Sequence, residues 1–308
     1  MKILTYHELD EKETLIPLMD QAFRWIFTPE QLERNIKKDA RLRGTPVGYA
    51  AVEGSRVVGF VGVMDLRTRN LEGETEPVGG VWGVATLPSH VKRKIATNLM
   101  KKAHEFFREK GYRFAFLCTS RVIVAYALYR KFGYIDAASF PSAYKLVTKP
   151  KGKHKTKHVA GKKTASLDWN KILEIYNKFS IGKTGLVIRD KQYLEMVRKR
   201  EHLRSTNFIV LEDGYAVFKK NRGILEVVEI AANSKETAKK LLAMLEAKAK
   251  TVICDRMVLD SITFDVYKAL GYHVERESHD LIMAAPLENA EFEQVYGDKF
   301  HMTNLDMF

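Results

Sequence analysis

A run of basic and imidazole side chains follows a strand-like segment in the first third of the chain. The stretch GVATLPSHVKRKIATNLM, residues 83–100, passes from an apolar run through a proline to His90, Lys92, Arg93 and Lys94, and then takes up helical spacing. The N–H groups that open a helix have no partner within it and carry partial positive charge, so they bind anions. We therefore expect a phosphate-binding turn here, with a solvated charged turn as the simpler alternative.

The strand that leads into this turn adds a second feature. A further apolar strand, RFAFLC, follows the helix. If the first strand parts from this neighbour at Cys118, its exposed backbone can pair with an extended ligand. The expected contacts lie on the strand, the turn and the first helical turn: Val84, Thr86, Lys92, Arg93, Lys94, Ile95, Ala96 and Thr97.

Composition narrows the classes of partner. The 308 residues suggest about two domains, and the net charge of +13 favours anions. A nucleic acid, a membrane surface or a polyanionic cofactor fits that charge, and so does a solvated basic surface. The apolar runs are too short to cross a bilayer, no signal peptide is recognisable, and both cysteines lie in apolar runs. These features favour a cytoplasmic protein without a membrane partner, and no pattern indicates a metal site.

Local signals place several elements. Lys12–Phe27 has a helical pattern, and Thr28 before Pro29 predicts a capping box for a second helix. A helix is expected from about Lys92 to Lys110, and Ser234 is the expected N-cap of another one. The runs YIDAASFPSAYKLV and YHVERESHDLIMAAP are each expected to return as one strand.

The order of these elements repeats, which predicts a duplicated α/β fold. ALYRKFGY in the first half matches FDVYKALGY in the second, in a shared Y-x-x-x-G-Y register that aligns Tyr129 with Tyr267. Either match alone is also an ordinary helix end with an aromatic core residue. We expect two domains, each a mixed twisted sheet flanked by helices. The expected segments are a first domain, a lysine-rich linker or hairpin, a second domain and a tail: 1–147, 148–164, 165–287 and 288–308.

The turn and the LYRKFGY motif resemble the GNAT superfamily of acyl-CoA-dependent N-acyltransferases. The family's turn reads R/Q-x-x-G-x-G/A, and the matching six residues are Val91-Lys92-Arg93-Lys94-Ile95-Ala96. Ala96 agrees with the motif, whereas Val91 replaces the basic residue and Lys94 replaces the central glycine. The resemblance implies that acetyl-CoA is the cosubstrate, and that Lys94 either weakens its binding or adds a phosphate contact.

The resemblance also implies a role for Tyr129 as the general acid. A primary amine attacks the thioester directly, and the tyrosine protonates the departing thiolate. A phenol with an ordinary pKa of about 10 stays protonated at neutral pH and can donate. Tyr126, one turn earlier, is an alternative donor, and a merely packed aromatic is the simpler interpretation of Tyr129.

Over residues 1–287 the chain resembles the tandem-domain enhanced intracellular survival (Eis-type) acetyltransferases. PSHVKRKIATNLM, GLVIRDKQYLEMV and EVVEIAANSKETAKKLL carry this likeness. Members of that branch add a sterol-carrier-like domain that ends in a catalytic carboxylate, and we expect this chain to lack it. The α-carboxylate of Phe308 is a candidate base if the tail folds back. Alternatively, the tail docks its aromatic residues on the second domain.

Other candidate bases are few. The segments Pro77–Leu87 and Arg113–Cys118 hold no acid, whereas Glu74 and Glu76 lie in the expected preceding loop and are more simply surface acids. The second half has no equivalent basic turn, so we expect a degenerate, cofactor-free copy. There, Glu226 and Glu229 are expected to face an acceptor cleft or, in part, solvent.

These observations favour an acetyl-CoA-dependent N-acetyltransferase that acts on an amine-bearing small molecule or on a protein lysine or N-terminus. A nucleic-acid-binding or RNA-acting protein is the main alternative, because of the net charge and the seven lysines of 148–164. That run lacks the interleaved aromatic residues that stack on bases. A sensor that binds acyl-CoA without catalysis is the third possibility.

Overall fold

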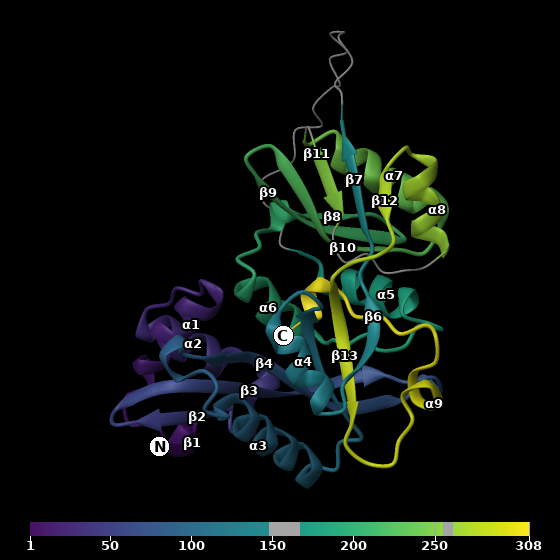
Figure 1. Cartoon of the computed structure of the whole chain (residues 1–308). Coiled ribbons are helices and arrows are strands. Elements are labelled where there is room, and N and C mark those ends of the chain that lie inside the picture. The colour runs from purple at the N-terminus through teal and green to yellow at the C-terminus, as the bar shows by residue number, and fades with distance from the viewer. Residues whose placement is uncertain (148–166, 250, 255–260, 308) are drawn as a thin grey trace. The chain divides into compact units, whose positions relative to one another are not determined.

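The computed structural model describes residues 1–147, 167–249, 251–254 and 261–307 (Figure 1). The expected lysine-rich linker or hairpin at 148–164 and the expected base at Phe308 lie outside the described residues. The chain divides into two compact units, and neither is a continuous stretch of sequence. Of the described residues, the first unit holds 1–138 and 279–300, and the second holds 139–278 and 301–307.

The first unit contains a seven-stranded sheet in the order β1-β2-β3-β4-β5-β13-β6. Strands β4 and β5 run parallel, while the pairs from β1 to β4 and the β5–β13 pair are antiparallel, so the sheet is mixed as predicted. The strands are β1 (Lys2–Thr5), β2 (Gly48–Glu53), β3 (Arg56–Arg69), β4 (Thr75–Thr86), β5 (Phe114–Ser120), β6 (Ile135–Ser139) and β13 (Asp280–Pro286).

Helices cover both faces of this sheet (Figure 1). On one face the backbone at Gly79 lies so close to Phe107 of α3 that an added Cβ would be 2.4 Å from its ring. On the other face, Gly83 lies beside Met19 of α1. The helices are α1 (Leu15–Phe23), α2 (Pro29–Lys38), α3 (Ile95–Glu109), α4 (Val124–Lys131) and α9 (Phe292–Tyr296).

Capping chemistry sets the ends of these helices. The predicted capping box is confirmed, because Gln31 N–H donates to Thr28 Oγ1 at 3.3 Å and Thr28 N–H donates to the Gln31 side chain at 2.9 Å. Helix α1 is shorter than the predicted Lys12–Phe27, because its first residues form a 3₁₀ turn and Arg24 takes a left-handed conformation with φ of 59°.

The second unit contains a six-stranded mixed sheet in the order β12-β7-β11-β10-β9-β8. Helices α7 and α8 pack on one face, around Leu241, Leu245 and Tyr267. The strands are β7 (Ser142–Leu146), β8 (Phe208–Val210), β9 (Gly214–Asn221), β10 (Ile224–Ala232), β11 (Thr251–Cys254) and β12 (His273–Glu275). The helices are α5 (Trp169–Phe179), α6 (Lys191–Arg200), α7 (Lys235–Glu246) and α8 (Ser261–Ala269).

The two sheets exchange strands along the chain. Each of the two runs that were predicted as one returning strand is split, into β6 and β7 and into β12 and β13, so those predictions were wrong. Strand β7 lies between β12 and β11 of the second sheet, and β13 lies between β5 and β6 of the first. Pro141, which lacks a backbone donor, separates β6 from β7. This exchange explains why the compact units differ from the segments expected from the sequence.

Among the described residues, none of the helices combines the length and the apolar character needed to traverse a lipid bilayer.

Candidate functional site

Strands β4 and β5 separate at Cys118, which meets the condition set for pairing with an extended ligand. Their last paired residues are Val81 and Leu117, so Cys118 is the first residue beyond the ladder. Strand β4 continues to Thr86 with only β3 as its neighbour, and β5 continues to Ser120 alongside β13. The β5-facing edge of β4 beyond Val81 therefore has no ladder partner in the described chain. Its N–H and C=O groups can pair with an extended ligand.

A β-bulge lies within the unpaired part of β4. Two residues, Gly83 and Val84, lie opposite the single residue Val61 of β3, between the pairs Gly62↔Trp82 and Phe60↔Ala85. Gly83 has φ of 59°, which glycine adopts without the steric cost of a Cβ. The bulge bends β4 and changes the direction of the groups that follow. A bulge beside an unpaired edge is typical of strands that border an active site.

The basic turn leads directly into an uncapped helix N-terminus. The helix begins at Ile95 rather than at the expected Lys92, and the side chain of the preceding Lys94 makes no capping hydrogen bond. The first internal bond of α3 runs from Asn98 N–H to Lys94 C=O at 3.0 Å. Earlier N–H groups, at Ile95, Ala96 and Thr97, therefore have no acceptor within the helix. A 15-residue helix with such an end is suited to bind phosphate.

Two lysines in this turn adopt the left-handed conformation that glycine normally supplies. Lys92 has φ of 64° and Lys94 has φ of 60°. Each such non-glycine residue costs about 1–2 kcal/mol. The turn therefore bends without the motif's glycine. Both side chains are exposed, and neither has an ion-pair partner among the described residues.

The third cation of the turn is held by a carboxylate from β2. Arg93 donates to Glu53 Oε1 at 2.8 Å, and His90 Nε2 lies 2.8 Å from Glu53 Oε2. The hydrogen bonds from Arg93 and then from His90 lower the pKa of Glu53 to about 2. Nothing in the sequence distinguished Glu53 from other surface acids, because its partners lie 37 and 40 residues away.

The other residues predicted to contact the cofactor differ in the exposure of their side chains. Val84, Thr86, Ala96 and Thr97 are half-buried, whereas Ile95 is buried and leaves only its backbone available. The Thr86 hydroxyl oxygen is buried without a hydrogen-bond partner in the described structure, and so is that of Thr119 on β5. Buried hydroxyls normally have a hydrogen-bond partner. These two hydroxyls therefore mark positions where a polar group of a ligand could supply the missing hydrogen bond. No motif in the sequence pointed to Thr119.

Tyr129 lies near the C-terminal end of α4 and is 5% exposed. Its C=O accepts from Tyr134 N–H at 3.2 Å, and Gly133 N–H donates to Arg130 C=O at 3.1 Å, which together form a Schellman motif. The Tyr129 and Tyr134 rings make the apolar contact of that motif, with centroids 5.9 Å apart. The second unit repeats this geometry at Tyr267, Gly271 and Tyr272. The shared Y-x-x-x-G-Y register is thus first of all a helix end.

The hydroxyl of Tyr129 has no hydrogen-bond partner among the residues described. Burial raises the pKa of this hydroxyl above its ordinary value, and the nearby Cys118 raises it further. Tyr126, the alternative donor, instead donates its hydroxyl to Asp136 Oδ1 at 3.0 Å. Of the two tyrosines, Tyr129 alone keeps its proton uncommitted to a neighbour in the described part of the chain.

A buried histidine supports Tyr134 from α3. His104 Nε2 lies 2.9 Å from the Tyr134 hydroxyl, and His104 is 3% exposed. Burial, followed by the positive charge of Arg108, lowers the pKa of His104 to about 4. The imidazole is therefore neutral at physiological pH and helps to fix the aromatic pair that contains Tyr129.

Two of the acids that were considered as bases prove to be structural. Glu76 lies within β4, is 5% exposed and forms an ion pair with Arg113, so its interpretation as a loop or surface acid was wrong. Glu229 is buried in an ion network, so it faces neither a cleft nor solvent. Both residues point inward from central strands, which the local sequence does not reveal.

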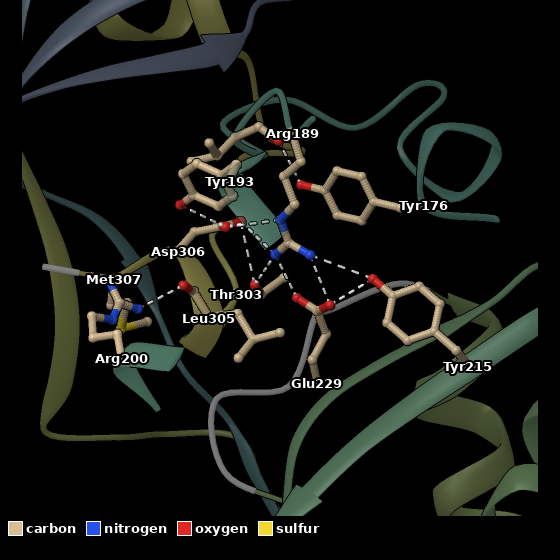
Figure 2. A network of polar contacts seen from close by, with 11 residues as sticks. Tyr176, Arg189, Tyr193, Arg200, Tyr215, Glu229, Thr303, Leu305, Asp306 and Met307 are labelled. Carbon is tan, nitrogen blue, oxygen red and sulfur yellow. Dashed lines mark hydrogen bonds and ion pairs between the residues drawn. The ribbon is translucent and has the colours of Figure 1, made fainter. Parts of the chain in front are cut away.

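The Glu229 network surrounds one guanidinium group (Figure 2). Arg189 donates to Glu229 at 2.9 and 2.6 Å, and its Nε and a terminal nitrogen donate to Asp306 at 2.9 and 2.7 Å. The Arg189 and Asp306 side chains are 0% exposed and that of Glu229 is 2% exposed. Tyr215 donates to Glu229 at 2.6 Å, and Tyr193 donates to Asp306 at 3.1 Å. Each ion therefore replaces its lost hydration with direct partners.

This network holds the C-terminal segment to the second unit. Thr303 Oγ1 accepts from Arg189 at 2.8 Å, and the Leu305 carbonyl accepts from Arg200 at 2.8 Å (Figure 2). The aromatic part of the tail lies elsewhere: Phe292 and Phe300 pack against Phe116 of β5, in the first unit. The expectation that these aromatic residues dock on the second domain was wrong.

Comparison with known proteins agrees with this geometry. Residues 5–136 match the family model described as an acetyltransferase (GNAT) domain. No curated protein matches the chain. A GCN5-related N-acetyltransferase from Kribbella flavida is similar in structure, with a TM-score of 0.66 and 19% identity, over 92% of this chain and 70% of that one.

Two further solved structures show the same fold. Eis1 from Mycobacterium abscessus has a TM-score of 0.62 and 16% identity, over 93% of this chain and 74% of that one. A putative acetyltransferase from Pyrococcus horikoshii has a TM-score of 0.54 and 16% identity, over 97% and 93%. At these identities the likeness concerns the fold alone. The predicted fold class, a tandem use of the GNAT fold with two mixed sheets, is confirmed.

Proposed function

We propose that this protein transfers an acetyl group from acetyl-CoA to a primary amine and that its first unit is the catalytic domain. The observation that supports this most strongly is the unpaired edge of β4, which leads through the basic turn into the uncapped N-terminus of α3. An extended arm that ends in a pyrophosphate has the shape and charge that this edge and helix end would bind.

We assign the residues of this edge and turn to different parts of the cofactor. The backbone of β4 around Val84 would pair with the amides of the extended arm, and Thr86 would offer its unsatisfied hydroxyl. The first N–H groups of α3, with Lys92 and Lys94, would bind the phosphates. When bound, acetyl-CoA supplies the activated acyl group as a thioester.

Tyr129 would hold a proton beside the sulfur. Its raised pKa keeps the phenol protonated throughout the physiological range, although it also makes the phenol a weaker acid. Complete transfer to a thiolate with an ordinary conjugate pKa of about 8.5 is uphill by ~2 kcal/mol even for an unperturbed phenol. We therefore assign Tyr129 the donation of a hydrogen bond that strengthens as negative charge develops on the sulfur, with the proton passing over as the C–S bond breaks.

The attacking amine must lose one proton before or during attack. Following the resemblance to Eis-type enzymes, we propose the α-carboxylate of Phe308 as the acceptor of that proton. A variant that lacks this residue is then expected to lose activity, mainly below pH 8, where alkyl amines are mostly protonated. The fold likeness to Eis1 supports placing the chain in that tandem-domain branch. The acceptor is an amine-bearing small molecule or a protein lysine or N-terminus.

The test combines binding with turnover. Acetyl-CoA should raise the melting temperature of the protein, and a panel of amines should reveal acetyl transfer. We expect Tyr129→Phe to lower kcat roughly 10²- to 10⁴-fold, whereas Tyr126→Phe, which removes a hydroxyl from the same helix, should change it little. No stabilisation at millimolar acetyl-CoA would count against the proposal. Stabilisation without turnover of any amine would indicate a cofactor-binding sensor instead.

A further inference from the structure

Glu53 is the last residue of β2, which is paired with β1 and β3 inside the first sheet. Its carboxylate therefore sits on a rigid element rather than on a mobile loop. From there it bonds His90, at the end of a 3₁₀ turn, and Arg93, next to the helix N-cap. The two contacts hold both ends of the basic turn to one fixed point.

The turn needs such support because of its backbone. Lys92 and Lys94 both adopt positive φ, a conformation that side chains other than glycine rarely take. Such conformations persist only where the surroundings impose them. Within the described chain, the hydrogen bonds and ion pairs that cross from the sheet to the side chains of this turn are those of Glu53.

The same contacts change the expected role of Arg93. Its guanidinium is directed to Glu53 by two of its nitrogens, at 2.8 and 3.5 Å, whereas Lys92 and Lys94 have no ion pair in the described structure. The lysines and the α3 N–H groups remain available to an anion. Arg93 is more suited to hold the turn than to meet the phosphates.

We propose that Glu53 is a positioning residue for cofactor binding, and that it takes over, through His90 and Arg93, the structural role of the missing turn glycine. This inference rests on the proposed function, because it concerns how the acetyl-CoA turn is shaped. It predicts that Glu53 governs the affinity for the cofactor and leaves the chemical step unchanged once the site is saturated.

The opposite effect is physically possible and would be visible. A carboxylate close to a phosphate site repels the ligand and competes for Arg93. If that repulsion dominated, removing the charge of Glu53 would strengthen binding. The sign of the effect therefore separates a positioning residue from a competing counter-ion.

The first measurement is the dissociation constant of coenzyme A, with KM and kcat for acetyl-CoA, in the full-length protein. We expect Glu53→Gln to weaken binding and raise KM roughly 3- to 10-fold with kcat unchanged. Glu105→Gln is the matched control, because Glu105 is a carboxylate in an exposed ion pair with Lys102 on α3. Unchanged or tighter binding in Glu53→Gln would overturn the proposal, as would an equal loss in Glu105→Gln.

The second measurement tests the link to the missing glycine. Lys94→Gly and Lys94→Ala both remove the lysine charge, but only glycine adopts φ of 60° freely. The loss caused by Glu53→Gln should persist in the Lys94→Ala background and shrink to less than about twofold in the Lys94→Gly background. Equal losses in the two backgrounds would contradict the proposed substitution for glycine.

The third measurement separates Glu53 from Arg93. If Arg93 acts only through Glu53, the Glu53→Gln/Arg93→Gln double variant should bind coenzyme A no more weakly than the weaker single variant. Additive losses would show that Arg93 contacts the ligand directly and would overturn its assignment. Wild-type protein that bound no coenzyme A would instead refute the proposed function itself, and the role of Glu53 with it.

Discussion

In each unit a helix follows a central strand, α3 after β4 and α7 after β10, but only α7 has a side-chain cap at its N-terminus. Helix α3 is preceded by Lys94, which has a left-handed backbone conformation and makes no capping hydrogen bond. Helix α7 is capped by Ser234, whose Oγ accepts from Thr237 N–H at 3.1 Å. The cap therefore occupies one of the N–H donors that an anion would need. The two helix starts therefore differ in the N–H groups that remain available to an anion.

The units also differ in how they place their charges. In the first unit, Glu53 is 44% exposed and bonds to a turn that adjoins the helix N-terminus. In the second, a bulge in β10 between Val227 and Glu229 corresponds to the bulge of β4, and Glu229 just after it is directed into the buried Arg189 network. The exposed cluster shapes a surface that a ligand can reach. The buried network organises the interior and fastens the C-terminal segment.

The largest effect should come from the buried network. Arg189→Met leaves two carboxylates together without their cation, so we expect the second unit to lose about 3–5 kcal/mol of unfolding free energy. Glu229→Gln should cost more than Asp306→Asn, because Arg189 overcomes burial to lower the pKa of Glu229, whereas burial raises that of Asp306. Urea unfolding, monitored by hydrogen exchange of the amides of β9 and β10, measures the unfolding free energy of the second unit.

The control for that experiment is an exposed pair in the same unit. Asp213→Asn breaks the 2.8 Å pair with Lys178, whose side chain is 63% exposed, and should cost less than about 1 kcal/mol. A loss of the same size in both variants would remove the distinction between buried and exposed charges.

The second prediction concerns pH and the first unit. The folded pKa of His104 is about 4, below its ordinary value, so between about pH 6.5 and 4 the unfolded chain binds a proton that the folded chain does not. The stability of the first unit should therefore fall by about 3 kcal/mol as the pH drops through that window. Hydrogen exchange of α3 across this range checks it. His104→Gln, which cannot titrate, should flatten the profile, and an unchanged slope would exclude His104 as the cause.

A smaller effect tests the capped helix. Ser234→Ala removes the side-chain acceptor of α7 and should lower the stability of the second unit by about 1 kcal/mol. The N–H groups exposed by this substitution should bind phosphate only weakly, because Lys235, the lysine beside this helix start, is paired with Asp265 at 3.1 Å. Thermal unfolding with and without phosphate measures both effects. Strong phosphate stabilisation of this variant would imply that the cap alone accounts for the difference in anion binding between the starts of α3 and α7.

The smallest effect concerns the exposed lysines. Lys92→Ala should weaken coenzyme A binding by about 0.2–1 kcal/mol at low salt, because one exposed ion pair, here between the lysine and a phosphate, contributes about that much. Raising the salt concentration should reduce the difference between variant and wild type, since exposed charges are screened. Titrations at two ionic strengths provide the measurement, and a salt-independent difference would point to a buried contact instead.

The sequence by itself determined the local features, because caps, turns and helix ends depend on residues within a few positions of each other. Thr28, Ser234 and the glycines before Tyr134 and Tyr272 all act as the local pattern indicated. The basic turn also follows from the run of residue types, and so do the two mixed sheets.

Only the tertiary structure decided which distant residues meet. Glu53 contacts residues 37 and 40 positions away, and Arg189 binds acids 40 and 117 positions away. Strands β7 and β13 exchanged sheets because pairing depends on which edges lie next to each other, not on the pattern within a strand. The burial of Glu76 and Glu229 has the same origin. A carboxylate on a strand is structural or catalytic according to the cation that the fold brings beside it, and no local pattern specifies that cation.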